Sequence, residues 1–131
     1  MFKVQGINHI TIRVSNLEES ITFYKNVLGA RILHKGNTDI YLDVGGVWLC
    51  LLEIIDAKPI CKNQIGVDHF AFTVSKEHFP KAVLLLNEQN VRITRGPLQR
   101  GGGNTVSFED PDGNEIELFT GSLKERMKDW K

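Results

Sequence analysis

Apolar and polar residues alternate in two segments of this chain, GINHITIRVS at residues 6–15 and GVDHFAFTVS at residues 66–75. A period of two is the pattern of a β-strand that has one face in a hydrophobic core. Both segments end in a Val-Ser pair, and apolar residues at helical spacing follow each of them. The sequence therefore predicts one strand-helix unit that is used twice.

The helix of the first half has recognisable ends. Apolar residues recur at helical spacing from Leu17 to Leu28, and Gly29 follows them. Ser15 stands three residues before Glu18, which is the spacing of a capping box, and glycine is the usual residue just after a helix. We therefore predict a helix that begins after Ser15 and ends at Gly29.

Three strand-like runs follow the helix in each half. A helical stripe from Phe79 to Leu86 precedes those of the second half, and a DPDG turn at Asp110 to Gly113 joins the last two. Each half reads β-α-β-β-β, so the sequence predicts an α+β fold. The runs are Arg31 to His34, Ile40 to Val44 and Val47 to Leu52 in the first half, and Val91 to Thr94, Asn104 to Glu109 and Glu115 to Phe119 in the second.

The apolar pattern stops at DAKPICKNQIG, residues 56–66, as it does in a linker. A chain of 131 residues with 41% hydrophobic residues is within the range of one domain with an adequate core. We predict a single domain over residues 1–131. Module one spans about 5–55, the linker about 56–66, module two about 67–120 and a C-terminal segment 121–131.

The net charge limits the kinds of molecule that the protein would bind, and the cysteines indicate its cellular compartment. The 16 basic and 16 acidic side chains cancel, so no overall field attracts nucleic acid or an anionic membrane. Cys50 and Cys61 form neither a CxxC pair nor a disulfide framework, and the N-terminus lacks the apolar stretch of a signal peptide. These features favour a cytoplasmic protein that binds a small molecule.

Two histidines occupy equivalent positions in the repeated segments. His9 and His69 each precede the alternating residues by the same distance, so equivalent strands deliver two imidazoles. A carboxylate on a neighbouring strand would complete a site for a divalent ion with open positions for a substrate. Glu115 and Glu117 both lie opposite the apolar face of their strand, and spacing alone does not choose between them.

The paired modules resemble the vicinal oxygen chelate superfamily, which includes glyoxalase I, extradiol dioxygenases and fosfomycin-resistance proteins. The motifs that carry the resemblance are NHI at residues 8–10, DH at residues 68–69 and DPDGNEIEL at residues 110–118. The resemblance implies a cup-shaped mixed sheet built from both modules. It also implies that His9, His69 and Glu117, four residues after the turn glycine, bind the metal.

Within the superfamily the chain is most similar to the fosfomycin-resistance thiol transferases. GGVWLCL at residues 45–51 and GSLKER at residues 121–126 match two of their motifs. The resemblance implies that a divalent ion, commonly Mn²⁺ with Zn²⁺, Ni²⁺ or Fe²⁺ as alternatives, helps a thiol to open an epoxide. It implies these residue roles: Thr11 and Arg126 as catalytic residues, and Tyr41, Trp48, Arg95 and Arg126 as substrate-binding residues.

Several positions depart from that pattern. The loop that binds potassium in glutathione-using members is replaced by Arg100 and three glycines, so potassium binding is not expected. Ser107 stands where a tyrosine contacts the phosphonate, and Arg95 replaces a lysine, which keeps the charge but changes its geometry. Cys50 occupies the first-module counterpart of Glu117, where a buried thiol is more often an inert core residue than a nucleophile.

Three functional hypotheses follow. The first is a thiol transferase, or a hydrolase, that acts on fosfomycin or a related small molecule. The second is a glyoxalase-type isomerase or lyase, or an iron-dependent dioxygenase, because two histidines and a carboxylate also suit non-haem iron. The third is a non-catalytic binding module, which the intact metal triad disfavours. The family resemblance also implies a homodimer in which the subunits exchange modules.

Overall fold

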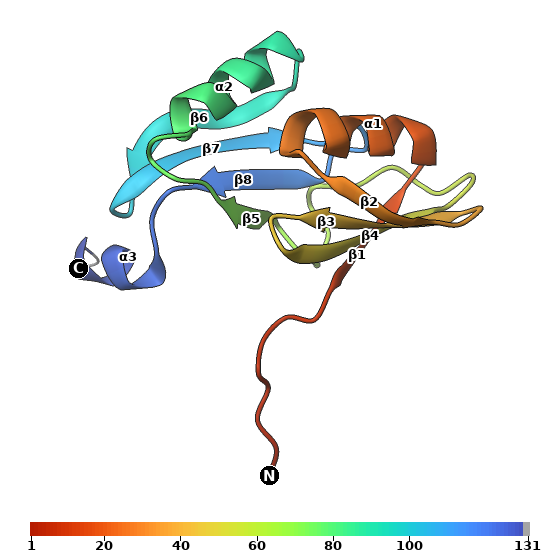
Figure 1. Ribbon diagram of the computed structural model, residues 1–131, viewed down its shortest axis with the longest axis horizontal. Coiled ribbons are helices and arrows are strands. Elements are labelled where there is room, and N and C mark those ends of the chain that lie inside the picture. The colour runs from red at the N-terminus through yellow and green to blue at the C-terminus, as the bar shows by residue number, and fades with distance from the viewer. Residues whose placement is uncertain (130–131) are drawn as a thin grey trace. The chain divides into compact units, whose positions relative to one another are not determined.

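The computed structural model describes residues 1–129, which belong to two compact units (Figure 1). The first unit is Met1–Lys58, and the second begins at Pro59. Each unit contains one four-stranded mixed sheet with a helix on one face. The predicted α+β class and the tandem β-α-β-β-β order are confirmed. No helix within these residues is long and apolar enough to cross a membrane.

The first unit follows the predicted order of elements. Its sheet has the strand order β1-β4-β3-β2, in which β1 runs parallel to β4 and the other neighbours are antiparallel. The parallel pair is possible because α1 carries the chain across the sheet between β1 and β2. The elements are β1 (Ile10–Val14), α1 (Leu17–Leu28), β2 (Arg31–Lys35), β3 (Asp39–Val44) and β4 (Val47–Glu53).

The start of α1 differs from the prediction by one residue. Asn16, not Ser15, is the N-cap, and its side chain accepts a hydrogen bond of 3.0 Å from the backbone nitrogen of Glu19. Asparagine is as strong a cap as serine, and Ser15 still belongs to the end of the preceding segment. The predicted end is confirmed, because Gly29 adopts the left-handed conformation with φ 65° and donates to the carbonyl of Lys25.

Alternation gives the first sheet one buried and one open face. The residues that α1 covers are apolar throughout, and Figure 1 shows this helix lying along the sheet. Burying each large aliphatic side chain contributes about 1.5–3 kcal/mol, which fixes the faces of all four strands. Thr11, Tyr41 and Trp48 are thereby directed to the open face. The buried set is Ile12, Val14, Ile40, Leu42, Val44, Leu49 and Leu51 from the strands, with Leu17, Ile21 and Tyr24 from α1.

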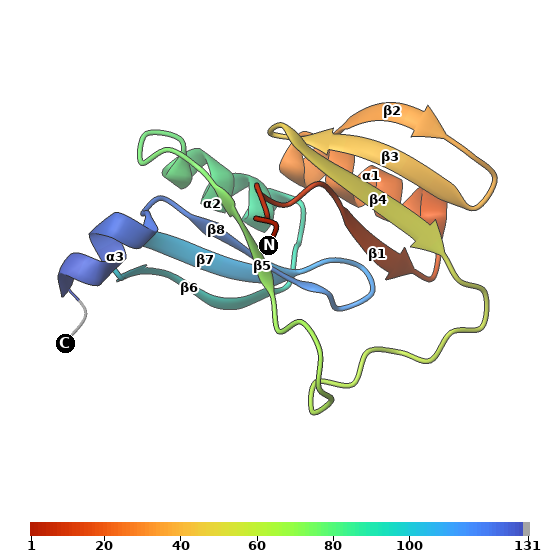
Figure 2. The ribbon, with the colours of Figure 1, turned by 90° about the horizontal axis from the view of Figure 1, so that it is seen from below.

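The second unit repeats this plan and adds a C-terminal helix. Its strand order is β5-β8-β7-β6, with β5 parallel to β8 and the other pairs antiparallel. Figure 2 shows α2 beside this sheet, and the irregular segment that leads into β5. The elements are β5 (Phe70–Thr73), α2 (Phe79–Glu88), β6 (Ile93–Arg100), β7 (Gly103–Glu109), β8 (Glu115–Phe119) and α3 (Leu123–Asp129).

Two elements of the second unit depart from the prediction. The strand predicted at Val91 to Thr94 begins at Ile93 and continues to Arg100 as β6. Gly96 and Pro97 hid this continuation, because both residues usually break a strand; here the pairing shifts register around them. The C-terminal segment, for which no helix was predicted, forms α3; Ser122 precedes this helix, and its hydroxyl accepts a hydrogen bond of 3.2 Å from the backbone nitrogen of Glu125.

The DPDG turn between β7 and β8 is confirmed. Asp110 is 5% exposed and its carboxylate accepts hydrogen bonds from the backbone nitrogens of Asp112 and Asn114 at 3.0 and 2.8 Å. This closed turn fixes the register of β8 against β7. It places Glu117 opposite Ser107, and both side chains lie on the face away from the buried Phe108 and Ile116.

Candidate metal and anion site

Glu117 is at the centre of a polar group on the open face of the second sheet. Its side chain is 15% exposed, and Oε1 lies 3.2 Å from Nε2 of His69. The hydroxyl of Thr105, on the neighbouring strand, donates a hydrogen bond to Oε2. Nη2 of Arg95 is 3.9 Å from the same oxygen, a distance of electrostatic attraction rather than hydrogen bonding. Glu117 is thus held in one orientation by two strands.

His69 is held from its other side by the preceding residue. Nδ1 of the ring is 2.7 Å from Oδ2 of Asp68. An ionised carboxylate can only accept, so the ring proton lies on Nδ1 and the lone pair of a neutral ring lies on Nε2. That lone pair faces the carboxylate of Glu117.

This arrangement fits a bound divalent ion. Nε2 and Oε1 are 3.2 Å apart, a separation that one divalent ion bound to both atoms would also give; a protonated ring would instead donate a hydrogen bond from Nε2 to the carboxylate. Neutral imidazole and carboxylate are common ligands of Mn²⁺, Zn²⁺ and Fe²⁺. The carboxylate on Nδ1 is the usual partner of a metal-bound histidine, because it fixes the tautomer and raises the basicity of the ring. His69 and Glu117 therefore have the chemistry of two metal ligands.

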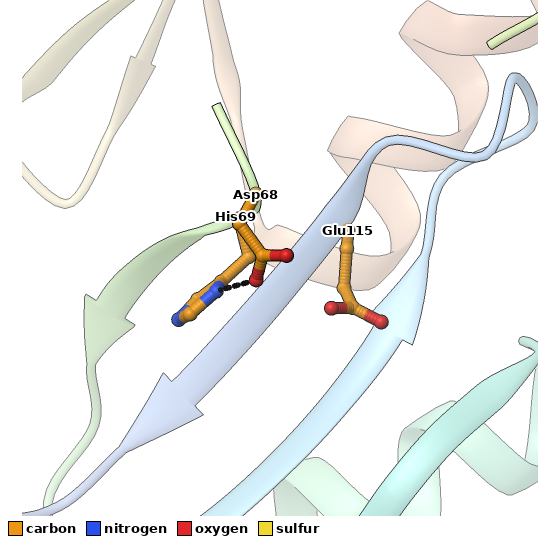
Figure 3. A group of neighbouring side chains, drawn as sticks. All are labelled: Asp68, His69 and Glu115. Carbon is orange, nitrogen blue, oxygen red and sulfur yellow. Dashed lines mark hydrogen bonds and ion pairs between the residues drawn. The ribbon is translucent and has the colours of Figure 1, made fainter. Parts of the chain in front are cut away.

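Glu115, the alternative carboxylate, occupies a different place (Figure 3). Asp68, His69 and Glu115 have potential ligand atoms within 4.8 Å of one another. However, Asp68 contacts Nδ1 of the ring, and Oε1 of Glu115 accepts a hydrogen bond of 2.8 Å from Thr94. Glu117 is the carboxylate that faces Nε2, so the geometry favours it over Glu115.

Arginine side chains surround a cavity beside His69 and Glu117. Its volume is about 520 Å³, and Arg95, Arg100 and Arg126 are among the residues that line it. Guanidinium groups pair with phosphonate, phosphate or carboxylate through two parallel hydrogen bonds, so this cavity suits a small anion. The remaining lining residues are Thr73, Thr105, Phe119, Gly121, Ser122 and Leu123.

A smaller cavity of about 230 Å³ lies beside His69 and Arg95 on the same sheet. Ser107 lines it together with Thr94 and Glu115. Ser107 thus presents a hydroxyl at the position where the family resemblance leads us to expect a tyrosine.

The open face of the first sheet carries a row of aromatic rings. The ring centroids of His9 and Trp48 are 4.3 Å apart, those of Trp48 and Tyr41 are 5.3 Å apart, and those of Tyr41 and His34 are 5.6 Å apart. Nδ1 of His9 lies 2.7 Å from Oδ1 of Asn8. With the amide oxygen accepting from Nδ1, Nε2 of His9 has the lone pair, as in His69.

Cys50 lies on this face but is buried. Burial raises the pKa of its thiol, although a hydrogen bond with Thr11 acts in the opposite direction. A raised pKa lowers the fraction of thiolate, the form that attacks electrophiles and binds metals. These properties favour an inert core residue over a nucleophile. Thr11 pairs with Cys50 in the register of β1 and β4.

Removing the carboxylate behind His69 is expected to weaken metal binding. Asp68→Ala deletes the hydrogen bond to Nδ1 and should lower the affinity for a divalent ion by about 10- to 100-fold. Asp68→Asn keeps an acceptor but loses the charge, so its loss should be smaller. Titration against a competing chelator measures both. Asp56→Asn, which removes an exposed carboxylate from the first unit, is the control; equal losses in all three variants would contradict the role of Asp68.

Four residues of these sites were not predicted from the sequence. Arg100 and Thr105 line the larger cavity, and Asp68 and Asn8 contact the Nδ1 atoms of the histidines. A signal for the last two was present, because each histidine directly follows a residue with a side-chain oxygen. Arg100 and Thr105 carry no comparable signal, since their positions depend on the pairing of β6 with β7.

The profile of the Glyoxalase/Bleomycin resistance protein/Dioxygenase superfamily matches residues 6–118 of this chain. This match covers most of the sequence. The chain belongs to that superfamily. It is 40% identical to the metallothiol transferase FosB of Staphylococcus epidermidis over 98% of this chain and 92% of that protein. It is 34% identical to the glutathione transferase FosA of Serratia marcescens over 95% of this chain and 86% of that protein.

Solved structures share the fold. The fosfomycin resistance protein FosX of Listeria monocytogenes, complexed with Mn(II) and a sulfate ion, superposes with a TM-score of 0.81 at 24% identity, over 96% of this chain and 98% of FosX. The predicted membership of the vicinal oxygen chelate fold is therefore confirmed. So is the predicted kinship with metal-dependent thiol transferases of fosfomycin resistance, which is an enzyme class.

Proposed function

We propose that this protein opens the epoxide ring of fosfomycin, or of a closely related phosphonate, by adding a low-molecular-weight thiol with the help of a divalent ion. The observation that carries the proposal is the arginine-lined cavity beside the facing pair His69 and Glu117. An anion-binding wall next to two metal ligands suits a substrate that has a phosphonate at one end and a reacting oxygen at the other.

The metal site in this proposal consists of His9, His69 and Glu117. His69 and Glu117 are supported by their contact, and His9 by its equivalent place in the repeat and by the same side-chain oxygen on Nδ1. Manganese is the proposed ion, with Zn²⁺, Ni²⁺ and Fe²⁺ as alternatives, because the donors are nitrogen and oxygen and FosX was solved with Mn(II). When bound, the ion acts as a Lewis acid that stabilises the negative charge on the epoxide oxygen.

The protein's own residues bind and orient the substrate. Arg95 and Arg126 donate forked hydrogen bonds to the phosphonate oxygens and so fix the ring for attack. Thr105 and Asp68 keep Glu117 and His69 in place. The thiolate forms a carbon–sulfur bond as the carbon–oxygen bond breaks, and the oxygen keeps the electron pair and then takes a proton. Thr11 is proposed to lie beside the reacting centre, with Tyr41 and Trp48 contacting the substrate.

A thiol-consumption assay tests the proposed reaction. Protein purified without chelator is mixed with fosfomycin, Mn²⁺ and, in turn, glutathione, cysteine and bacillithiol, and a further arm uses water alone. We expect consumption of fosfomycin that depends on the metal and is abolished by EDTA. If no nucleophile supports metal-dependent consumption, the fosfomycin reaction is excluded for this protein. Buried Cys50 argues against the glyoxalase-type alternative, in which this position supplies a further ligand.

Three further expectations remain predictions. The two units are proposed to form one domain with its linker at 56–66, and the protein to form a homodimer that exchanges these modules. The protein is also proposed to act in the cytoplasm. The absence of the potassium loop motif leads us to expect no requirement for potassium, since three glycines follow Arg100 in its place.

A further inference from the structure

The β6–β7 hairpin and α3 make one wall of the larger cavity. Arg100 ends β6, Gly101 and Gly102 form the turn, and Gly103 begins β7. Figures 1 and 2 both show α3 beside this hairpin. The wall therefore brings Arg100, from the hairpin, and Arg126, from α3, to the same cavity.

Packing explains the glycines of this hairpin better than turn geometry does. Gly101 and Gly102 have φ values of +61° and +83°, which a tight hairpin requires but which asparagine also tolerates. The backbone of Gly103 has no such requirement, and yet a Cβ there would lie 2.6 Å from the backbone nitrogen of Gly121. Glycine at position 103 is therefore required by the chain segment that enters α3.

Residues of α3 also lie close to the two glycines of the turn. A Cβ on Gly101 would lie 2.5 Å from Cδ of Arg126, and a Cβ on Gly102 would lie 3.2 Å from Cβ of Glu125. The stem of Arg126 thus lies directly over the bare backbone of the turn. Any side chain at position 101 would move Arg126.

Apolar burial does little to hold α3. Leu123 and Met127, its large apolar residues, are 76% and 56% exposed. A seven-residue helix with exposed apolar residues has no strong anchor of its own. Close contact with the glycine hairpin therefore constrains the direction of Arg126.

We propose that Gly101, Gly102 and Gly103 are positioning residues that hold Arg126 in the anion-binding cavity. This inference rests on the proposed anion-binding role of Arg126. The glycines touch no substrate and act only through the guanidinium group that they direct. A side chain at position 101 is expected to weaken anion binding without unfolding the protein.

The chain offers a matched control for this test. Gly45 is the first residue of the two-glycine turn between β3 and β4, and its φ of +58° is close to that of Gly101. A Cβ on Gly45 would meet no atom of residues 1–129 within 4 Å. Gly45→Ala and Gly101→Ala therefore carry the same backbone strain, and only the second disturbs Arg126.

Calorimetric titration with methylphosphonate, in Mn²⁺-loaded protein, provides the measurement. Gly101→Ala should weaken binding on the order of tenfold, as expected for the loss of one charge-assisted contact, and Gly45→Ala should bind like the parent protein. In an Arg126→Ala background, Gly101→Ala should have no further effect, because it acts through Arg126. Gly103→Ala, whose Cβ would displace the segment that leads into α3, should also weaken binding.

The inference is wrong if Gly101→Ala binds methylphosphonate as the parent does, if its effect persists in full without Arg126, or if Arg126→Ala does not weaken binding. Fosfomycin turnover is measured separately on the same proteins. If fosfomycin is not turned over but Gly101→Ala still weakens methylphosphonate binding, the proposed reaction is rejected and the role of the hairpin is retained. The two failures are thereby distinguished.

Discussion

Glu117→Gln is expected to abolish stoichiometric binding of a divalent ion and to lower metal-dependent turnover by at least two orders of magnitude. Glutamine has the shape of glutamate but is neutral, so the oxygen that faces Nε2 of His69 becomes a weak ligand. The ion contributes several kcal/mol to the reaction, and each 1.36 kcal/mol is about a factor of ten in rate. Metal analysis after gel filtration and the fosfomycin assay measure the two losses.

Glu115→Gln is the matched control, because it makes the same change two residues away on the same strand face. The carboxylate of Glu115 accepts a hydrogen bond from Thr94 and does not face Nε2 of His69, so this variant should keep its metal. Both variants should retain their melting temperature, since neither residue belongs to the apolar core. Metal retained by Glu117→Gln and lost by Glu115→Gln would assign the carboxylate to Glu115. His9→Ala and His69→Ala are expected to lose the ion as well.

Elements with strong local signals were predictable from the sequence. The alternation around Ile12 and Phe72 identified the repeated strand, Gly29 marked the end of α1, and DPDG marked the turn before β8. Each of these signals acts through neighbouring residues, by burial of one face or by a required backbone angle. The β-α-β-β-β order of both units follows from them.

Errors arose where two local signals competed. Ser15 and Asn16 are both good N-caps, and only the direction in which the chain leaves β1 decides between them. Gly96 and Pro97 suggested the end of a strand, but pairing with β7 carries β6 through to Arg100. The capping residue of α3, Ser122, is visible in the sequence, where it also belongs to the family motif GSLKER.

The sequence predicted on which face of the sheet the candidate site residues lie, but not how far apart they are. Alternation correctly put Glu115 and Glu117 on one face, but a shift of two residues leaves facing unchanged, so it cannot tell which of them reaches His69. The register that separates them is set by the turn at Asp110, through its hydrogen bonds. Thr105 was missed for the same reason, because its contact with Glu117 crosses between strands.

Arg95 and Arg126 are held differently in the cavity, and this makes Arg126 the cleaner test of phosphonate binding. Arg95 is drawn toward Glu117, the proposed metal ligand, so part of its charge is already balanced within the protein. Arg126 extends from a short helix over a glycine turn and lines the cavity. Removing Arg126 therefore takes a cationic group from the cavity wall and leaves the contact between Arg95 and Glu117 in place.

Arg126→Ala is expected to cost on the order of 2–4 kcal/mol of transition-state stabilisation, as for the loss of one preorganised donor. This corresponds to a decrease of about 30- to 900-fold in kcat/KM for fosfomycin. Arg126→Lys should recover only part of the loss, because an ammonium group lacks the planar fork that matches a phosphonate. Steady-state kinetics with saturating metal and thiol measure both values.

Lys124→Ala is the control, since it removes a positive charge from the same helix at a residue that does not line the cavity. It should change kcat/KM by less than about twofold, as expected when an exposed charge is removed. Equal decreases in Lys124→Ala and Arg126→Ala would mean that the general positive field of α3, and not a directed contact, attracts the substrate. A decrease confined to Arg126→Ala, with metal content unchanged, would separate phosphonate binding from the metal chemistry of His69 and Glu117.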